Sequence, residues 1–519
     1  MNRVIKKIAA IMLTMAVVCM IGCKKADDPS NGGNNGNNGG NGGETPEAPA
    51  IVSTSEVQYD GTVFIEAVFE DETKMYFAIV SPTEVSVANG EFFYQDNPSL
   101  AYEYRGEVII PETISHLGTT YTVVAIGYKA FFQCDLVTSV YIPNTVVSID
   151  SYVDTHYNYG SFQDCTNLNS IRLSKNLRII GDRTFEGCPC FADSVTISNN
   201  ITSIGKNAFD SKIVVFCADS CTIAGGYYKG VFYSSFPNMN SISFTNNVKI
   251  LPAYLFSSMN PTEIDIPPTI IRLADWAFRG CTNLEKINGL DNVVDIGYRA
   301  FYECESLNSV SLNSSLTNIR YGVFLGCRSL SFIKIPNSVT TIGANAFERS
   351  GLQSIEWGGS IDTIEAFAFS SCPLFELSIP NSVSYIGGFA FSECNKMTSL
   401  VIGNSVTIIE PAAFYSCYEL ESVTLGNAVT SIGANAFSGC DKLTEIILPS
   451  SIESLGTRAF DSYFSYPNSI TCLAINPPML GEDVFGDRWI EAVYVPMSSV
   501  EAYKTADGWS QYADVIVGI

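Results

Sequence analysis

The chain has 519 residues, of which 46% are hydrophobic and 16% are charged, so it carries enough apolar material to build a folded core. Its 53 acidic residues against 29 basic ones give a formal net charge of −24. This argues against a nucleic-acid-binding or anionic-lipid-binding surface, because both need clustered Lys and Arg. With only two histidines, His116 and His156, histidine-based metal sites and Ser-His or Cys-His catalysis are disfavoured as well.

Residues 1–22 have the pattern of a lipoprotein signal peptide. Three basic residues precede a 15-residue, almost uncharged stretch (8–22), which is shorter than the roughly 20 residues of a membrane-spanning helix. The stretch ends in the letters MIGC, which resemble the bacterial lipobox, although the first position of that motif is usually Leu. An ordinary secretory signal with an incidental cysteine is the alternative. We expect cleavage before Cys23 and lipidation of that residue.

Residues 23–50 predict a lipidated cysteine followed by a tether. The letters KKADD after Cys23 look like the short charged signal that sends some lipoproteins of Bacteroidetes-type bacteria to the outer cell surface. A solvated charge run explains them equally well. The Asn/Gly run at 31–43 cannot bury apolar area and behaves as a flexible coil. We therefore expect the protein at the outer membrane, lipid-anchored and exposed on the cell surface.

Residues 51–105 predict a small β-rich N-terminal cap. Apolar and polar side chains alternate there, as in GTVFIEAVFE (61–70) and MYFAIV (75–80). Alternation with a period of two is typical of strands that bury one face. The stretch contains no copy of the repeat that follows it.

From residue 106 to residue 470 the sequence repeats itself. The shared pattern is C-x-x-L-x-x-[IV]-x-[IL]-[PG]-x-[SA]-[VI]-x-x-I-G-x-x-A-F, and a clear copy is CRSLSFIKIPNSVTTIGANAFE at 327–348. After a first interval of 31, the repeat phenylalanines are spaced by 22 to 24 residues, which gives about 15 repeats. These residues are Phe131, Phe162, Phe185, Phe209, Phe232, Phe256, Phe278, Phe301, Phe324, Phe347, Phe369, Phe391, Phe414, Phe437 and Phe460.

Each position of the repeat has a physical interpretation. The [IV]-x-[IL] alternation predicts a short strand with one buried face, and Pro or Gly ends it. The second apolar pair, as in Val339 and Ile342, predicts another short extended segment. Gly343 is expected to permit the turn that follows, and the Ala-Phe pair fills the interior. One repeat cannot bury its apolar face alone, so stacked repeats must form a solenoid of parallel strands.

Residues 471–519 predict a C-terminal strand-helix cap. We expect a last strand and then a helix from Val500 to Ala506, with Trp509 and Tyr512 covering the final turn. A solenoid needs such a cap, because an open end exposes core and an unpaired strand edge.

The repeat resembles the BspA-like (treponemal-type) leucine-rich repeat family of bacterial surface proteins, because 23-residue spacing, I-G-x-x-A-F and F-x-x-C recur together over residues 106–470. The resemblance implies a repeat solenoid: a leucine-rich-repeat right-handed superhelix of short parallel β-strands and turns. Known members are adhesins that bind host matrix proteins or other bacteria, and others have no known ligand.

Ten of the 16 cysteines lie three residues after a repeat phenylalanine. Metal binding or redox chemistry is one interpretation, but a buried apolar role fits better, since no Cys-x-x-Cys pair occurs and the cysteines follow the core pattern. Cys217 and Cys221 depart from the column and are candidates for a disulfide. We expect no metal and no cofactor.

The candidate ligand-binding residues lie at an insertion and on a strand. The insertion near 150–161 carries Tyr152, His156, Tyr157 and Tyr159, and exposed tyrosines are typical of protein and sugar contacts. Aromatic packing over a distorted turn is an equally good explanation. The outward column of the first strand begins with Tyr141 and Arg172 and continues with small, mixed, nearly neutral residues, which suits a broad protein contact; plain solvation is the alternative.

Two of the tryptophans also have a predicted place. Trp357 aligns with a core leucine and is assigned to packing, whereas Trp276 is expected to be partly exposed.

No phosphate-binding, zinc-protease, hydrolase or calcium motif is present in the sequence, and we predict that the protein is not an enzyme. The preferred function is a cell-surface binding scaffold or adhesin for protein partners, either host matrix or other cells. The alternatives are a glycan-binding accessory protein of surface polysaccharide capture and a structural envelope component. Membrane contact is expected only through the lipid.

Overall fold

The computed structural model describes residues 46–59, 62–88, 104–149, 152–153, 158–211, 213–218, 221–223, 226–228, 231–233, 241–245, 248–257, 259, 261–462, 468–486 and 490–519. The expected signal peptide, Cys23 and most of the tether lie outside these residues. The chain divides into two compact units, 1–249 and 250–519, which are described separately. Within the described residues no helix is long and apolar enough to cross a bilayer.

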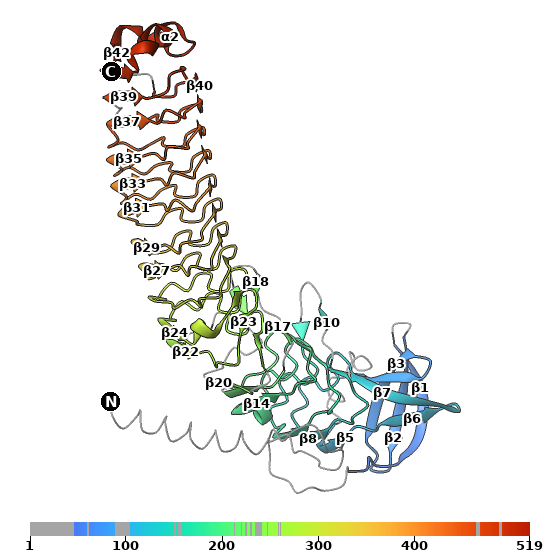
Figure 1. Cartoon of the computed structure of the whole chain (residues 1–519). Coiled ribbons are helices and arrows are strands. Elements are labelled where there is room, and N and C mark those ends of the chain that lie inside the picture. Colours follow the sequence, from blue (N-terminus) through green and yellow to red (C-terminus); the bar gives the residue numbers. More distant parts are fainter. Residues whose placement is uncertain are drawn as a thin grey trace, which may run out of the picture. The chain divides into compact units, whose positions relative to one another are not determined.

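Unit 1 begins with an antiparallel sheet, in agreement with the predicted β-rich cap. Strands β1 to β4 follow one another as a meander, and β4 then pairs in parallel with β7, which also pairs with β6 (Figure 1). The apolar side chains of the alternating pattern, among them Ile65 and Phe77, are buried. The bounds are β1 (Ile51–Tyr59), β2 (Thr62–Phe69), β3 (Lys74–Ser81), β4 (Glu84–Ala88), β6 (Thr113–His116) and β7 (Thr119–Ile126).

Side-chain contacts join β1, the end strand of this sheet, to β6. The Thr54 hydroxyl donates to the Ser115 carbonyl at 3.2 Å, and it lies 3.0 Å from Nδ1 of His116. The other ring nitrogen of His116 lies 3.5 Å from the Glu56 carboxylate. These contacts shield a strand edge that would otherwise be a template for association.

One parallel ladder continues from this sheet through unit 1, from β7 through β9, β13, β15 and β17. Two separate parallel sheets accompany it, one of β5, β8 and β12 and the other of β14, β16 and β20. Two short antiparallel hairpins, β10–β11 and β18–β19, interrupt the regular turns. The bounds are β5 (Gly106–Ile109), β8 (Val137–Tyr141), β9 (Ser148–Ile149), β10 (Tyr152–Val153), β11 (Asn158–Tyr159), β12 (Ser170–Arg172), β13 (Ile179–Ile180), η3 (Pro189–Phe191), β14 (Ser194–Ile197), β15 (Ser203–Ile204), β16 (Ile213–Phe216), β17 (Thr222–Ile223), β18 (Gly226–Tyr228), β19 (Val231–Tyr233) and β20 (Ser241–Phe244).

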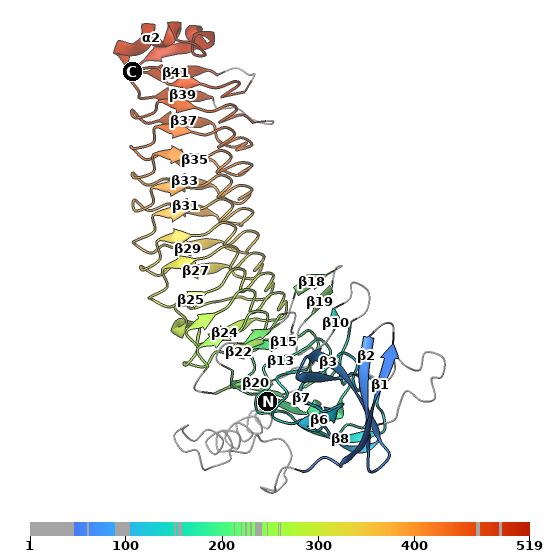
Figure 2. The same ribbon diagram turned by 90° about the vertical axis from the view of Figure 1, so that its right-hand side faces the viewer.

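Unit 2 is a regular stack of turns with two parallel ladders, as Figures 1 and 2 show. The first ladder, called the strand face, is made of the longer strands β22 (Glu263–Asp265), β24 (Lys286–Asn288), β27 (Phe332–Lys334), β29 (Ser354–Glu356), β31 (Glu376–Ser378), β33 (Ser399–Val401), β35 (Ser422–Thr424), β37 (Glu445–Leu448), β39 (Ser469–Cys472), β41 (Ala492–Val495) and β42 (Ile516–Gly518). The second ladder is made of the two-residue strands β21 (Ile250–Leu251), β23 (Arg272–Leu273), β25 (Asp295–Ile296), β26 (Asn318–Ile319), β28 (Thr341–Ile342), β30 (Thr363–Ile364), β32 (Tyr385–Ile386), β34 (Ile408–Ile409), β36 (Ser431–Ile432), β38 (Ser454–Leu455) and β40 (Met479–Leu480), with η4 (Leu290–Asn292) between turns.

The repeat phenylalanines form a continuous stack in the core of unit 2. From Phe256 to Phe485, successive ring centroids lie 4.9 to 6.0 Å apart with nearly parallel planes. Phe347, for example, is completely buried. Burial of one such side chain contributes about 1.5–3 kcal/mol, so the predicted core column stabilises the stack of turns.

The glycine of the repeat pattern has a different role from the one expected. Gly343 has no positive φ, so it is not needed for a left-handed turn. A Cβ at Gly343 would lie 2.8 Å from the carbonyl carbon of Arg320 and 2.9 Å from the carbonyl oxygen of Ile319. The expectation that this glycine permits the turn was wrong: its missing side chain lets adjacent turns approach each other.

The left-handed residues lie instead on both sides of the core phenylalanine, two residues before and two residues after it. Non-glycine residues at the first of these positions have φ between 48° and 61°, although such a conformation is normally unfavourable for side chains other than Gly, Asn and Asp. Their amide groups donate to the next turn, as in Trp276 N to Tyr298 O at 2.9 Å. The first column, called the left-handed column, contains Lys129, Arg183, Asn207, Tyr254, Trp276, Arg299, Gly322, Asn345, Phe367, Phe389, Ala412, Asn435, Arg458 and Asp483.

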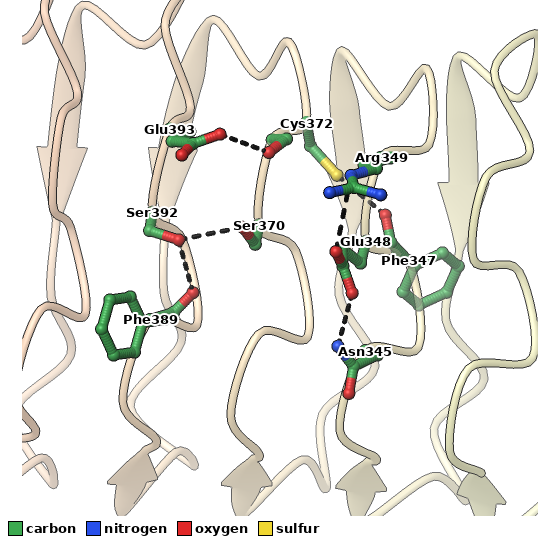
Figure 3. A network of polar contacts seen from close by, with 10 residues as sticks. Asn345, Phe347, Glu348, Arg349, Ser370, Cys372, Phe389, Ser392 and Glu393 are labelled. Atoms are coloured by element: carbon green, nitrogen blue, oxygen red, sulfur yellow. Dashed lines mark hydrogen bonds and ion pairs between the residues drawn. The ribbon is translucent and has the colours of Figure 1, made fainter.

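Cysteine and serine side chains satisfy backbone carbonyls within the stack (Figure 3). The Cys372 thiol donates to the Phe347 carbonyl of the preceding turn at 3.1 Å, and the Ser392 hydroxyl donates to the Phe389 carbonyl at 3.1 Å. The Ser370 and Ser392 hydroxyls lie 2.9 Å apart. The Cys372 and Ser370–Ser392 contacts join neighbouring turns, and the Ser392–Phe389 bond lies within one turn.

The C-terminal cap agrees with the prediction. It contains η5 (Met497–Ser499), α2 (Val500–Thr505) and η6 (Ser510–Val515). Trp509 is completely buried and its indole N–H donates to the Pro478 carbonyl at 2.8 Å. Tyr512 contacts the last ring of the stack, Phe485, edge-on at 6.1 Å. The cap therefore closes the end of the phenylalanine column.

Candidate binding surfaces

The strand face of unit 2 presents alternate side chains to solvent. In β22, β27 and β31 the middle residue is buried and the two flanking residues are exposed. Most of the exposed groups are small or polar. Several are joined in pairs across neighbouring strands, such as Lys286 with Glu263 at 2.9 Å and Asn288 with Asp265 at 2.7 Å. Phe332 and Ile447 are exceptions, being 48% and 54% exposed.

In unit 1 the same column begins differently from the expectation. Tyr141 and Arg172 are neighbours in register on β8 and β12, but Tyr141 is only 8% exposed. The guanidinium of Arg172 lies 5.0 Å from its ring centroid and covers it. Tyr141 also contributes to the wall of a groove of about 610 Å³, together with Ile109, Pro111 and the segment 46–49. Tyr141 shares the strand column of the exposed Arg172, but the long side chain of this next turn lies over its ring and buries it, so its role as a ligand contact stays a prediction.

The tyrosine insertion is only partly described. Tyr152 pairs with Tyr159 through the backbone of the β10–β11 hairpin, whereas His156 and Tyr157 lie outside the described residues. The Tyr159 ring packs edge-on against Phe132 at 5.0 Å, and Nζ of Lys129 lies 4.2 Å from its centroid. Tyr159 therefore fastens the hairpin to the solenoid, as the packing alternative expected, and its role as a ligand contact stays a prediction.

A second cluster, which the sequence analysis did not identify, lies in unit 2. Its centre is Trp276, a half-buried member of the left-handed column, in agreement with the expected partial exposure. The indole stacks on the Tyr254 ring at 6.2 Å and meets the Tyr302 ring edge-on at 5.8 Å. Because these residues come from three successive turns, the parallel stacking of the solenoid is what brings them together. We call the set Tyr254, Trp276, Arg279, Arg299, Tyr302 and Tyr321 the Trp276 cluster.

Two guanidinium groups lie against these rings. The Cζ of Arg279 is 4.6 Å from the Trp276 centroid, and the Cζ of Arg299 is 4.9 Å from it. Arg299 is also 4.8 Å from the Tyr321 centroid, and its Nη2 donates to the Tyr321 hydroxyl at 2.7 Å. Contacts of this kind between a guanidinium and an aromatic face contribute about 0.5–2 kcal/mol each. The rings thus fix the orientation of both arginines.

The charges around the cluster are unevenly compensated. Asp295 lies 3.1 Å from Arg272 and 2.9 Å from Arg320, so these two neighbouring arginines share its single negative charge. The pKa of Tyr302 is raised by burial and by its hydrogen bond to the Glu303 carboxylate, while the positive charges of Arg279 and Arg299 oppose that rise. An alignment of the repeats would show the signal: aromatic and Arg residues at matching positions of consecutive turns.

Trp357 packs as expected. Its half-buried ring contacts the core Phe369 edge-on at 5.6 Å.

The cysteines give no sign of reactive chemistry. Most of the column is buried, and burial raises the pKa of the Cys372 thiol to about 12. Cys217 and Cys221 are present as two thiols and not as the disulfide considered above. Among the described residues no group of three or more His, Cys, Asp or Glu side chains could hold a metal ion.

These features define a leucine-rich-repeat β-solenoid of about 15 parallel-strand turns with an N-terminal antiparallel sheet and a small C-terminal helix. The repeat region matches the family described as "BspA type Leucine rich repeat region (6 copies)" over residues 124–227, 227–353 and 340–466, which is about two thirds of the chain. The chain therefore belongs to the BspA-type leucine-rich repeat family, as the sequence pattern indicated.

Several solved structures are similar to the chain. A leucine-rich repeat protein from Bacteroides ovatus is 23% identical with a TM-score of 0.42, and the match covers 86% of this chain and 98% of that one. A leucine rich cell surface protein from Faecalibacterium prausnitzii is 20% identical with a TM-score of 0.26, covering 63% and 93%. The Leucine Rich Repeat protein of T. pallidum is 29% identical with a TM-score of 0.28, covering 37% and 82%. No protein of curated function matches the chain.

Proposed function

We propose that this chain is a surface-anchored, non-enzymatic scaffold that binds protein partners, host matrix or other cells, through the strand face of its solenoid. The observation that carries the proposal is the strand face itself: a regular array of exposed, mostly small and polar side chains held by a fully buried core. Flat, rigid arrays of this kind suit a broad protein contact, because little conformational freedom is lost on binding.

The chemistry of the described residues supports a binding role over a catalytic one. The buried thiols are hydrogen-bonded to carbonyls and protonated, and the exposed carboxylates lie on the strand face among lysines and amides. The family to which the chain belongs is a repeat scaffold. Membership of this family implies a scaffold but does not identify a ligand. The proposal of a protein partner is therefore based on the strand face.

The packing of Tyr159 weakens the alternative of glycan capture by the tyrosine insertion. Sugar stacking needs a free aromatic face, whereas one face of Tyr159 is approached by Lys129 at 4.2 Å and its edge by Phe132. The candidates Tyr152, His156, Tyr157 and Arg172 stay as a secondary surface for the same protein partners.

Surface anchorage is the second part of the proposal. Cys23 at the end of the apolar stretch 8–22, followed by an Asn/Gly-rich tether, supports a lipid anchor at the outer membrane with the solenoid exposed. Labelling of cells with a radioactive fatty acid tests it: the wild-type chain takes up label and Cys23→Ser does not. Label in the serine variant would contradict the anchor, and shaving of intact cells with protease tests exposure.

Binding is tested with the full chain on a surface coated with host matrix extract, before and after periodate oxidation of its sugars. We expect binding to survive oxidation. Ser378→Trp places a bulky ring on the strand face and should reduce binding, whereas Thr407→Trp, an exposed position beside the second ladder, is the matched control. Loss of binding after oxidation would replace the protein partner by a glycan, and equal effects of both variants would remove the strand face from the proposal.

A further inference from the structure

Arg299 in the Trp276 cluster has no ion-pair partner among the described residues. Its Nη2 donates to the neutral hydroxyl of Tyr321, while its Nε is buried without a hydrogen-bond partner, and none of the ion pairs among the described residues includes it. The neighbouring Arg272 and Arg320 differ, since both contact Asp295. A half-buried guanidinium with unused donors is unfavourable unless another group completes it.

The aromatic rings of the cluster contact the arginines and one another. Arg279 and Arg299 both lie within 5 Å of the Trp276 centroid, and Tyr254 stacks on the same indole. The guanidinium of Arg299 also lies over the ring of Tyr321. Stacking of a sugar ring is therefore disfavoured. The half-buried Arg299 contributes the Nη groups of a planar guanidinium, whose geometry matches a carboxylate.

The site is pre-organised by the solenoid. Arg299 has φ of 52°, and its amide donates to the Tyr321 carbonyl of the next turn at 3.0 Å, so its backbone is fixed by the stacking of turns. Its side chain is fixed in addition by the rings. Trp, Tyr and Arg are the residue types that dominate the energetics of protein interfaces; Tyr321 of the cluster is 38% exposed, and Tyr298 beside it is 49% exposed.

We propose that the Trp276 cluster is a carboxylate-binding subsite for an Asp or Glu side chain of a partner protein, with Arg299 as the main contact and Arg279 beside it. The inference rests on the proposed function and names the chemistry of the partner. The carboxylate accepts hydrogen bonds from the guanidinium edge and supplies the charge that Arg299 lacks. With a net charge of −24, the rest of the chain repels acidic segments, which makes a locally positive, rigid cluster selective.

A peptide selection tests the subsite. A phage-displayed library of short random peptides is selected on the full chain in detergent and, in parallel, on Arg299→Asn. Asn occupies the same left-handed position at Asn345 and Asn435, so this variant is compatible with the fold. We expect the peptides retained by the wild type and lost by the variant to be rich in Asp and Glu. Selected peptides without an acidic excess would overturn the proposal.

Affinity measurements on one selected peptide sharpen the result. In fluorescence anisotropy, Arg299→Asn should weaken its binding about tenfold or more, as expected for loss of a charge-assisted hydrogen bond, and amide-for-acid replacement in the peptide should have the same effect. Arg458→Asn is the matched control, since Arg458 is an exposed arginine of the same left-handed column and should leave affinity unchanged. An equal loss of affinity in both variants would mean that the peptide responds to the overall charge of the chain and not to the Trp276 cluster, which would overturn the proposal.

Three further outcomes separate the proposals. Chondroitin sulfate that binds in an Arg299-dependent way, with no acidic peptide selected, would assign the subsite to an acidic sugar and overturn the peptide proposal. If Arg299→Asn still binds matrix protein and no acidic peptide is selected, only the subsite falls. If the wild type binds no matrix protein, the proposed function falls, while acidic peptides that need Arg299 would still support the subsite.

Discussion

Phe367 and Phe389 lie on successive turns of unit 2 with their rings stacked, the centroids 4.8 Å apart and the planes 3° from parallel. Both backbones are left-handed, with φ of 58°, and both rings are more than a third exposed. Two bulky residues therefore occupy a conformation that disfavours them by about 1–2 kcal/mol each. The amide of each donates to the following turn at 3.2 Å, and the ring contact adds to this compensation.

We expect the two rings to be energetically coupled. Phe367→Asn and Phe389→Asn each relieve the backbone, because Asn tolerates the left-handed region and already occupies it at Asn345. In a double-mutant cycle measured by chemical denaturation, the coupling energy should be about 0.5–1.5 kcal/mol. Additive effects of the two substitutions would mean that the stack contributes nothing and that backbone hydrogen bonds alone hold these turns.

Gly343 provides a test of how closely the turns are packed. Gly343→Ala should lower the free energy of unfolding by about 1–3 kcal/mol, because the added methyl group would overlap the backbone of Ile319 and Arg320. Gly359→Ala is the matched control: its Cβ would meet only the Asn337 side-chain oxygen at 3.8 Å, and we expect a change within about 0.5 kcal/mol. Similar unfolding midpoints for both variants would show that neighbouring turns can separate without loss.

The core could be predicted from sequence because a single chemistry recurs there. Each turn needs one aromatic ring at the same place, so Phe347 and its equivalents form a visible column, and Trp509 stands out as the cap that ends it. The left-handed column was missed because the requirement is conformational. The backbone of the next turn satisfies its amide, so residues as different as Arg299 and Ala412 occupy it.

The candidate sites could be predicted only where side chains act alone. The exposure of Tyr141 depends on Arg172, which lies 31 residues later, and the Trp276 cluster depends on which residues of successive turns meet. Both the burial of Tyr141 and the composition of the Trp276 cluster depend on which residues of successive turns lie in register. The half-burial of Trp276 was expected, but its contact with two arginines follows only when the turns are placed at their observed spacing.

The thiol column should be chemically silent in the folded protein. Cys372 is buried, donates to the Phe347 carbonyl and has a pKa raised to about 12 by burial, so almost none of it is thiolate near neutral pH. We expect iodoacetamide to label the half-buried Cys190 and Cys217 first, with Cys372 labelled only after denaturation. Mass spectrometry of peptides from native and unfolded samples measures this. Rapid native labelling of Cys372 would indicate that the turns open frequently.

Glu186 in unit 1 should make stability fall as the pH rises. Its side chain is three quarters buried, and burial, followed by the nearby Asp210 and Asp164, raises its pKa, although Arg183 opposes the rise. Between the usual Glu pKa and this raised value the folded state binds more protons than the unfolded state. The contribution of Glu186 to the free energy of unfolding is therefore highest at pH values below that interval, and it falls as the pH rises through the interval.

Glu186→Gln should remove this slope. The amide oxygen can still accept from Gln163 and Arg183, which now contact the carboxylate at 3.0 and 3.2 Å. Relative to wild type, we expect the variant to gain up to about 1 kcal/mol at neutral pH and nothing in acid, as shown by denaturation curves across the pH range. Glu263→Gln is the control of opposite sign, because the hydrogen bond from Lys286 lowers the pKa of Glu263, so its contribution disappears as the pH falls. If Glu186→Gln were instead destabilised most at neutral pH, the ion pair between Glu186 and Arg183 would stabilise the fold by more than the burial of the carboxylate destabilises it.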